Sequence, residues 1–281
     1  MSAFLLVGAS QVVTGEPDPA TGVRTGAAVA VEGGLIAAVG PEPELARRFC
    51  TLPRVDCVGG VLAPGFVDAH THAVFGAWRA EEYALRCRGV PYTELARRGG
   101  GILASVRDLR SRSEDELVEL TRPRLREMLR QGTTTAEVKS GYGLRTEDEL
   151  KMLRVVRRLD DEGPLDLVPT FLGAHDVPPE FRERRAAYVD LVVEEMIPAV
   201  AEARLARFCD VFAEPGFFSR EEARRILDEA GLAELGEVRT EGALPERENL
   251  LQFGHGELFA GEEAYDADPG GVGEDLHRAQ D

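Results

Sequence analysis

Residues 61–72 read VLAPGFVDAHTH, an apolar segment that ends in two histidines two positions apart. Side chains at positions i and i+2 of a strand point to the same side. The pattern therefore predicts a strand that carries His70 and His72 on one face of its end. Two neutral imidazoles in this arrangement are suited to hold a divalent cation. Two histidines in an ordinary polar loop are the plainer alternative, but the apolar strand and the PGFVD turn before them favour a metal site.

Strand and helix patterns alternate from this segment to about residue 231. Serine or threonine followed three residues later by glutamate predicts helix starts with capping boxes at Ser113, Thr146 and Ser219. Apolar residues at helical spacing follow each of these positions. Strand-like apolar runs cover 61–67, 133–139, 165–172 and 208–213. The segment from 61 to 231 is therefore predicted to contain four βα units in series.

Four such units form either a doubly wound parallel sheet or a (β/α) barrel. No GxGxxG motif opens a helix after a strand, which argues against a dinucleotide-binding fold. The polar residues gather where the predicted strands end, at His70 and His72, Lys139 and Tyr142, His175, and Glu214. Barrel enzymes build their active sites at that end of the strands. We therefore predict an α/β fold whose main domain, residues 61–231, is a (β/α) barrel.

A small β domain is predicted for residues 1–60, where short apolar runs are separated by glycine-rich turns. The runs at 27–31 and 35–39 flank Gly33 and Gly34 and have the form of a β-hairpin. The expected organisation is thus a small β domain followed by the barrel domain, with a tail at 232–281.

The chain has 281 residues, with 33 Lys and Arg against 50 Asp and Glu, and a formal net charge of −17. Such an acidic chain argues against nucleic acid or an anionic membrane surface as a partner, because phosphate binding needs a basic face. No apolar run approaches the roughly 18 residues of a membrane span, and no basic residue precedes the short apolar run at the N-terminus. The four cysteines form no CxxC pair. We expect a cytoplasmic protein with reduced thiols that acts on a small molecule.

Several longer motifs narrow this prediction. They are THAVFG with Arg79 shortly after it, GGGI at 99–102, GTTT at 132–135, KSGYGL at 139–144, TFLGAH at 170–175 and DVFAE at 210–214. In this order and at these spacings, the chain resembles the imidazolonepropionase family of the amidohydrolase superfamily. The resemblance extends over roughly residues 1 to 230, and KSGYGL and TFLGAH are its specific parts together with the HTH segment.

The resemblance implies a reaction and a set of site residues. A metal-activated water would open the cyclic amide C–N bond of 4-imidazolone-5-propanoate to give N-formimidoyl-L-glutamate, a step of histidine degradation. His70 and His72 would bind one divalent metal ion, zinc or iron, while Arg79, Tyr142 and His175 would contact the substrate. A guanidinium suits the propanoate carboxylate, a phenol can hydrogen-bond a ring or carboxylate atom, and an imidazole can polarise a carbonyl or donate to it. A homodimer is the default oligomer for such enzymes.

Each of these residues also has a plainer interpretation. Arg79 would be one more surface arginine, Tyr142 would only pack within its Gly-Tyr-Gly turn, and His175 would be a hydrogen-bonded histidine at a strand end. Within these motifs, we prefer the binding roles. Lys139 and Glu137 lie two apart on one predicted strand, and we assign Lys139 no metal, with a buried ion pair as the plainer alternative.

The resemblance ends at about residue 231. The last 51 residues contain 13 acidic and 3 basic side chains, nine glycines and no strand-like run, so a poorly ordered tail is expected. By the resemblance, a third histidine ligand on the fifth strand and an aspartate on the eighth should follow, together with the acid and base residues. The sequence offers neither ligand in a strand context, although a catalytic zinc has three protein ligands as a rule. We therefore expect an incomplete barrel, caused by truncation or by a change of reading frame.

Two alternatives to the imidazolonepropionase activity remain open at this point. The first alternative is a catalytically inactive fragment of such an enzyme. The acidic tail and the missing metal ligands favour this alternative. The second alternative is another cyclic amidohydrolase or a deaminase of the superfamily. The motifs KSGYGL and TFLGAH argue against it.

Overall fold

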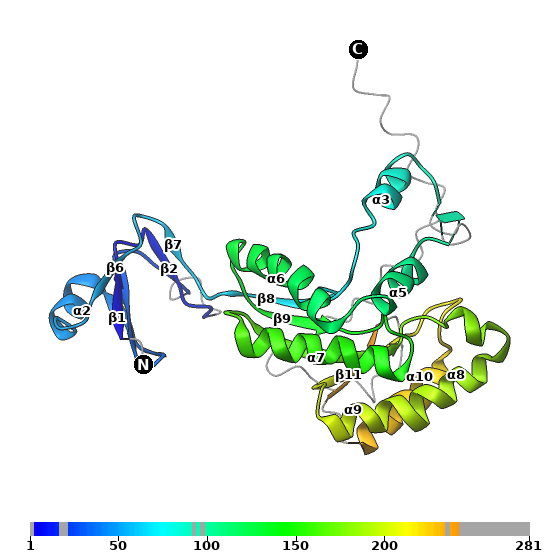
Figure 1. Cartoon of the computed structure of the whole chain (residues 1–281). Coiled ribbons are helices and arrows are strands. Elements are labelled where there is room, and N and C mark those ends of the chain that lie inside the picture. The colour runs from blue at the N-terminus through cyan, green and yellow to red at the C-terminus, as the bar shows by residue number, and fades with distance from the viewer. Residues whose placement is uncertain (1–2, 17–21, 92–93, 96–98, 234–236, 242–281) are drawn as a thin grey trace, which may run out of the picture.

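The computed structural model describes residues 3–16, 22–91, 94–95, 99–233 and 237–241 of the chain (Figure 1). Its strands are β1 (Phe4–Val7), β2 (Gln11–Val13), β3 (Val23–Arg24), β4 (Ala27–Glu32), β5 (Leu35–Pro41), β6 (Arg54–Asp56), β7 (Val61–Leu62), β8 (Phe66–Thr71), β9 (Thr133–Lys139), β10 (Asp166–Ala174), β11 (Phe208–Phe212) and β12 (Glu237–Glu241). Its α-helices are α2 (Glu42–Arg48), α3 (Ala80–Cys87), α5 (Ile102–Arg110), α6 (Glu114–Arg130), α7 (Thr146–Glu162), α8 (Arg185–Leu191), α9 (Ile197–Ala203) and α10 (Arg220–Leu232). A 3₁₀ turn, Pro179–Arg184, precedes α8, and a π-helical turn, Val192–Met196, joins α8 to α9.

The strands before residue 63 form a small β unit, which Figure 1 shows on one side of the molecule together with α2. One sheet has the order β5-β4-β1-β6, and a second has the order β3-β2-β7. The expected hairpin is confirmed, because β4 and β5 run antiparallel on either side of Gly33 and Gly34. Both glycines have a positive φ, which glycine adopts without steric cost. α2 is an addition to the predicted elements, and its Leu45 packs in one apolar cluster with Leu5 and Ala28.

The predicted strand at 61–67 is divided in two at residues 63–65. β7 pairs in parallel with β2 and so belongs to the small β unit, whereas β8 begins the large sheet. Pro64 has no N–H to give to a strand ladder. Gly65 is needed beside it, since a Cβ there would lie 2.1 Å from Thr134 Oγ1. The chain therefore passes from one sheet to the other at these residues, slightly after the predicted boundary.

Five parallel strands form the large sheet, in the order β12-β11-β10-β9-β8. At least one α-helix lies between each strand and the next, with α6 against β9, α7 against β10 and α10 against β11 (Figure 1). The predicted series of four βα units is confirmed. Every strand pairs with its neighbour in the sequence, whereas a doubly wound sheet reverses its strand order at a switch point. The order is thus that of part of a (β/α) barrel.

The large sheet and its helices share one apolar core. Buried side chains from both layers form it, such as Leu117 of α6, Leu153 of α7 and Phe171 of β10. Across the described part of the chain, no helix has the length and apolar composition that crossing a membrane requires.

Two of the three predicted capping boxes are confirmed. Ser113 and Ser219 cap α6 and α10, and in each case the glutamate three residues later returns a hydrogen bond to the cap. The third is wrong, because α7 has Arg145 as its N-cap without a side-chain cap bond. Glu149, the expected partner of Thr146, turns toward the loop that precedes the helix instead.

The region after residue 231 holds a strand that its composition did not indicate. β12 pairs in parallel with β11, and its Arg239 is the register partner of Asp210. The expectation of no further strand is therefore wrong for these residues, because an edge strand recruits a neighbour through backbone hydrogen bonds that any non-proline residue makes. The predicted tail otherwise falls largely on residues 234–236 and 242–281, which lie outside the described residues.

The cysteines provide a test of this packing. Cys209 of β11 is fully buried, and burial together with the Asp210 carboxylate raises the pKa of its thiol, while Cys50 and Cys87 are exposed. Thiolate is the reactive form of cysteine. We expect an alkylating reagent at pH 8 to modify the two exposed cysteines quickly and Cys209 only after unfolding in urea, as mass spectrometry of peptides will measure. Rapid labelling of Cys209 in native buffer would show that the large sheet is not packed in solution.

Candidate active site

His70 and His72 lie side by side at the carboxyl end of β8. Their ring centroids are 5.6 Å apart and their planes are inclined by 65°. His70 is exposed and His72 is half-buried. β8 is the outer strand of the large sheet on this side, so this pair stands at the sheet's edge.

Two further rings come from the next two strands. His72 stacks on His175, with centroids 4.9 Å apart and planes inclined by 12°. Tyr142, in the loop after β9, lies 5.2 Å from His72 and 5.4 Å from His175 between centroids. His175 directly follows β10. The carboxyl ends of β8, β9 and β10 thus bring together His70, His72, Tyr142 and His175, which we call the ring cluster.

His175 has a defined tautomer. Its Nδ1 lies 2.9 Å from the carbonyl oxygen of Gly141. A carbonyl only accepts, so Nδ1 carries the hydrogen and Nε2 keeps a free lone pair. Burial lowers the pKa of His175 to about 4, against the opposing effect of the Gly141 hydrogen bond. Burial, followed by the charges of His175 and His70, also holds the pKa of His72 well below its usual value. Both imidazoles are therefore neutral at pH 7.

An open hollow of about 440 Å³ lies beside the ring cluster, within the size range of small-molecule sites. His72 and Tyr142 contribute to its lining, and so do the aromatic side chains of Phe75, Trp78 and Tyr83. Arg79 lines the same hollow at the start of α3, with its Nη1 3.5 Å from Glu82 Oε2. The structure therefore places Arg79 on the same hollow as two members of the ring cluster.

The segment 73–79, which ends in Arg79, is held by two neighbouring helices. Arg124 of α6 donates to three of its backbone carbonyls at 2.6–3.0 Å. Asp108 of α5 accepts a backbone N–H of the segment at 2.7 Å. Gly76 permits this approach, since a Cβ there would lie 1.5 Å from Asp108 Oδ2. The position of Arg79 thus depends on contacts outside its own helix.

Lys139 belongs to a buried ion cluster next to the rings. Its Nζ lies 2.7 Å from Asp210 Oδ2 and 3.0 Å from Glu137 Oε1, and the three side chains are at most 4% exposed. Thr170 donates to Glu137 at 2.6 Å, so the cluster joins β9, β10 and β11. Burial acts to lower the pKa of Lys139, but the two carboxylates outweigh it and the pKa is raised. The Lys139–Glu137 pair considered from the sequence is therefore present, with Asp210 as its third member.

The imidazole pair fits part of a metal site. His72 Nδ1 is buried and has no hydrogen-bond partner, which leaves a nitrogen lone pair or N–H without a protein contact. Imidazole nitrogens bind zinc at roughly 2.0–2.1 Å, and the two adjacent rings suit a shared ion. Within the described residues, no group of three or more His, Cys, Asp or Glu side chains is placed to hold a metal ion. His70 and His72 would thus supply two ligands, where a catalytic zinc site usually has three from protein.

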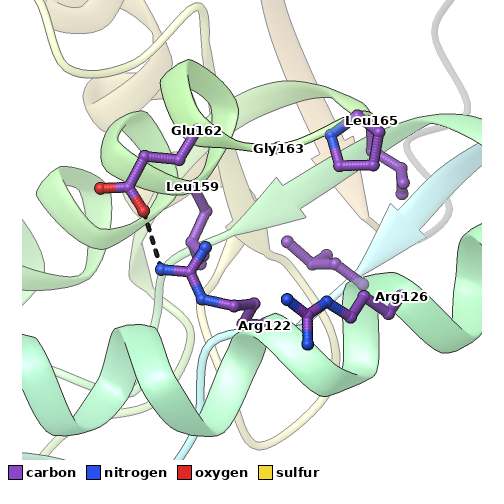
Figure 2. A pocket seen from close by; sticks show the side chains of 8 residues that line it. Arg122, Arg126, Leu159, Glu162, Gly163 and Leu165 are labelled. Atoms are coloured by element: carbon purple, nitrogen blue, oxygen red, sulfur yellow. Dashed lines mark hydrogen bonds and ion pairs between the residues drawn. The ribbon is translucent and has the colours of Figure 1, made fainter.

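A second, smaller hollow of about 70 Å³ lies near the start of β10, away from the carboxyl ends of the strands (Figure 2). The carboxyl end of α7, the residues after it and part of α6 line it, and Arg122 and Glu162 pair across it at 2.7 Å. In barrels, residues at the amino ends of the strands serve stability. We assign no binding role to this hollow.

Glu149, expected from the sequence only as the capping partner of Thr146, is a fully buried carboxylate near the site. It lies in helical register with Met152, Leu153 and Val156, all of them buried on the apolar face of α7. A carboxylate on an apolar face needs buried hydrogen-bond donors, because an unpaired buried charge is costly. That spacing is the signal by which the sequence could have revealed it.

Comparison with known proteins agrees with the motifs. A sequence profile described as an imidazolonepropionase-like composite domain of bacteria matches residues 27–49. The chain is 54% identical to the imidazolonepropionase of Symbiobacterium thermophilum over 238 residues, which cover 81% of this chain and 56% of that protein. It is 54% identical to that of Myxococcus xanthus over 206 residues, which cover 73% of this chain and 49% of that protein. The chain thus spans about half the length of the curated relatives it matches.

Solved structures resemble the chain at the level of the fold. Aminofutalosine deaminase from Helicobacter pylori matches 84% of this chain and 50% of its own, with a TM-score of 0.53 and 17% identity. Ochratoxinase from A. niger matches 83% of this chain and 54% of its own, with a TM-score of 0.52 and 18% identity. These likenesses concern architecture, whereas the close relatives share residues throughout most of the chain. Over most of its own length, this chain is thus similar in sequence to about half of an imidazolonepropionase.

Proposed function

We propose that this chain carries metal- and substrate-binding residues for imidazolonepropionase chemistry. The reaction is hydrolysis of the cyclic amide C–N bond of 4-imidazolone-5-propanoate to N-formimidoyl-L-glutamate. The supporting observation is the ring cluster, whose His72 and Tyr142 line one hollow with Arg79. In this proposal the partial barrel is that of a cytoplasmic metallohydrolase.

In this proposal, each residue at the site binds a different part of the substrate. Arg79 pairs with the propanoate carboxylate, for which a guanidinium is the matching group. Tyr142 donates its hydroxyl hydrogen to an oxygen of the substrate. His175 accepts a ring N–H at Nε2, because its Nδ1 hydrogen is already given to Gly141 and its pKa of about 4 keeps it neutral. From the sequence alone, His175 could either donate to the substrate or polarise its carbonyl. With Nδ1 bonded to Gly141, Nε2 acts as an acceptor.

His70 and His72 would hold one divalent ion, zinc or iron, both of which imidazole accepts. When bound, the ion supplies a more acidic water as the nucleophile. The chain's own contribution is to keep His72 neutral, by burial and by the charges around it, so that its ring nitrogen is free to act as a ligand.

A catalytically inactive form is the second candidate, because the described residues supply two metal ligands rather than three. Ring opening of 4-imidazolone-5-propanoate by the full 281-residue chain with added zinc or iron distinguishes the two. Turnover that needs Arg79 supports the proposal, and binding of imidazole-4-propanoate without turnover supports the inactive form. Preference for an amino-substituted heterocycle in the same assay would instead indicate a deaminase.

Metal binding can be tested without turnover. Replacing His72 by alanine removes one of two proposed ligands, so we expect the zinc affinity to fall at least about tenfold. Competition with a chromophoric chelator measures this affinity. His175→Gln, which keeps both proposed ligands, should stay within about twofold of the original chain. Equal affinity of the His72→Ala chain would show that zinc binds elsewhere.

A further inference from the structure

Glu149 is a fully buried carboxylate near the start of α7 that the substrate roles above do not use. Its Oε1 accepts the N–H groups of Gly143 and Leu144 at 2.8 Å each, and its Oε2 accepts that of Gly141 at 2.9 Å. Ser140 adds a side-chain hydrogen bond, and these donors act against burial, which raises the pKa of Glu149. Because four donors point at two oxygens, the carboxylate is the form that the site satisfies.

The loop of residues 140–144, whose N–H groups Glu149 binds, is also bound through its carbonyl groups. Arg110 of α5 donates through Nε to the carbonyl of Gly143 at 2.7 Å and through Nη2 to that of Leu144 at 3.1 Å. Leu144 has a φ of 51°, in the left-handed region that is costly for a residue with a Cβ. A strained loop conformation is therefore kept in place by an anion on its N–H groups and a cation on its carbonyls.

The same loop sets two residues of the ring cluster. It contains Tyr142, and its Gly141 carbonyl accepts the Nδ1 hydrogen of His175. The fit is close, since a Cβ at Gly141 would lie 2.9 Å from His175 Nδ1. We infer that Glu149 is a positioning residue: by binding the loop amides it aims the Gly141 carbonyl at His175, so that Nε2 stays an acceptor and Tyr142 keeps its place. The substrate-binding consequence rests on the function proposed above, and the tautomer of His175 does not.

Glu149→Gln tests this inference with little change in size. The carboxamide still accepts through its oxygen, but its NH₂ group faces a backbone N–H, so at least one loop amide loses its acceptor. At a fixed pH of 7.5, long-range ¹H–¹⁵N spectra of the imidazoles should show Nδ1–H for His175 in the original chain and a shift toward Nε2–H in the variant. His175→Gln assigns the signal. Affinity for imidazole-4-propanoate, measured by calorimetry, should fall about tenfold, as loss of a charge-assisted hydrogen bond predicts.

Glu147→Gln is the matched control, because it removes the same charge from the same helical turn at an exposed position. It should leave both the tautomer and the affinity unchanged. A folded Glu149→Gln chain, with Cys209 still protected from alkylation, that keeps the Nδ1–H tautomer would overturn the inference. A changed tautomer with unchanged analogue affinity would keep the positioning role and count against the proposed function.

A measurement on the unaltered chain covers the case in which the variant does not fold. Hydrogen exchange should find the amides of Gly141, Gly143 and Leu144 protected to the level of the β10 core, because a buried carboxylate holds them. Exchange at the rate of an open surface loop would show that Glu149 does not hold the loop, and would contradict the inference.

Discussion

Replacing Lys139 by methionine should lower the free energy of unfolding by about 3–5 kcal/mol, because it leaves two buried carboxylates without their cation. Glu137 and Asp210 are at most 4% exposed, so water cannot take the place of the ammonium group. Methionine fills a similar volume, which separates the charge effect from a cavity effect. Urea unfolding followed by circular dichroism measures the loss, which is a large fraction of the total stability of a typical domain.

Two controls belong with this experiment. Arg130→Met also removes a cation from an ion pair, but the Arg130 and Glu127 side chains are 74% and 56% exposed, so a far smaller loss than for Lys139→Met is expected. The triple variant Lys139→Met, Glu137→Gln and Asp210→Asn removes every charge of the cluster and should recover part of the loss. A Lys139→Met chain as stable as the original would mean that the ion cluster is open to water in solution.

Lowering the pH from 7 to 5 in the presence of a chelator should cost about 2 kcal/mol of stability through His175 alone. The pKa of His175 is about 4 in the folded chain, against an ordinary value of 6.5. The unfolded chain therefore binds more protons between these two values, and stability rises with pH in that window. The contribution is present in full above pH 6.5 and is lost progressively as the pH falls toward 4. His72, whose pKa is also lowered, acts in the same direction.

The His175→Gln variant isolates this effect. Its stability should change less between pH 7 and pH 5, and the difference between the two slopes is the contribution of His175. Denaturant melts at a series of pH values give both slopes. Parallel slopes for the two chains would show that His175 is solvated and titrates in the folded state as it does when unfolded, which would also contradict its burial in the ring cluster.

Much of the architecture follows from short-range patterns. The strand at 133–139 is found as predicted, and the capping boxes at Ser113 and Ser219 are present. These features depend on neighbours within a few residues, where periodicity and cap chemistry act directly. The failure at Thr146 has a physical reason: Glu149 meets the same local rule, but its carboxylate instead accepts from donors of residues 140–144, directly before the helix.

The candidate active site could likewise be predicted only in part from the sequence. Spacing along one strand was enough to place His70 beside His72, and sequence motifs were enough to name Tyr142 and His175. The packing of β8, β9, β10 and β11 decided the remaining contacts. It stacks His72 on His175, places the Gly141 carbonyl where it accepts the Nδ1 hydrogen of His175, and brings Asp210 to Lys139. The reason is that side-chain periodicity sets which face of a strand a residue occupies, whereas the pairing of separate strands sets which faces meet and how deeply their charges are buried.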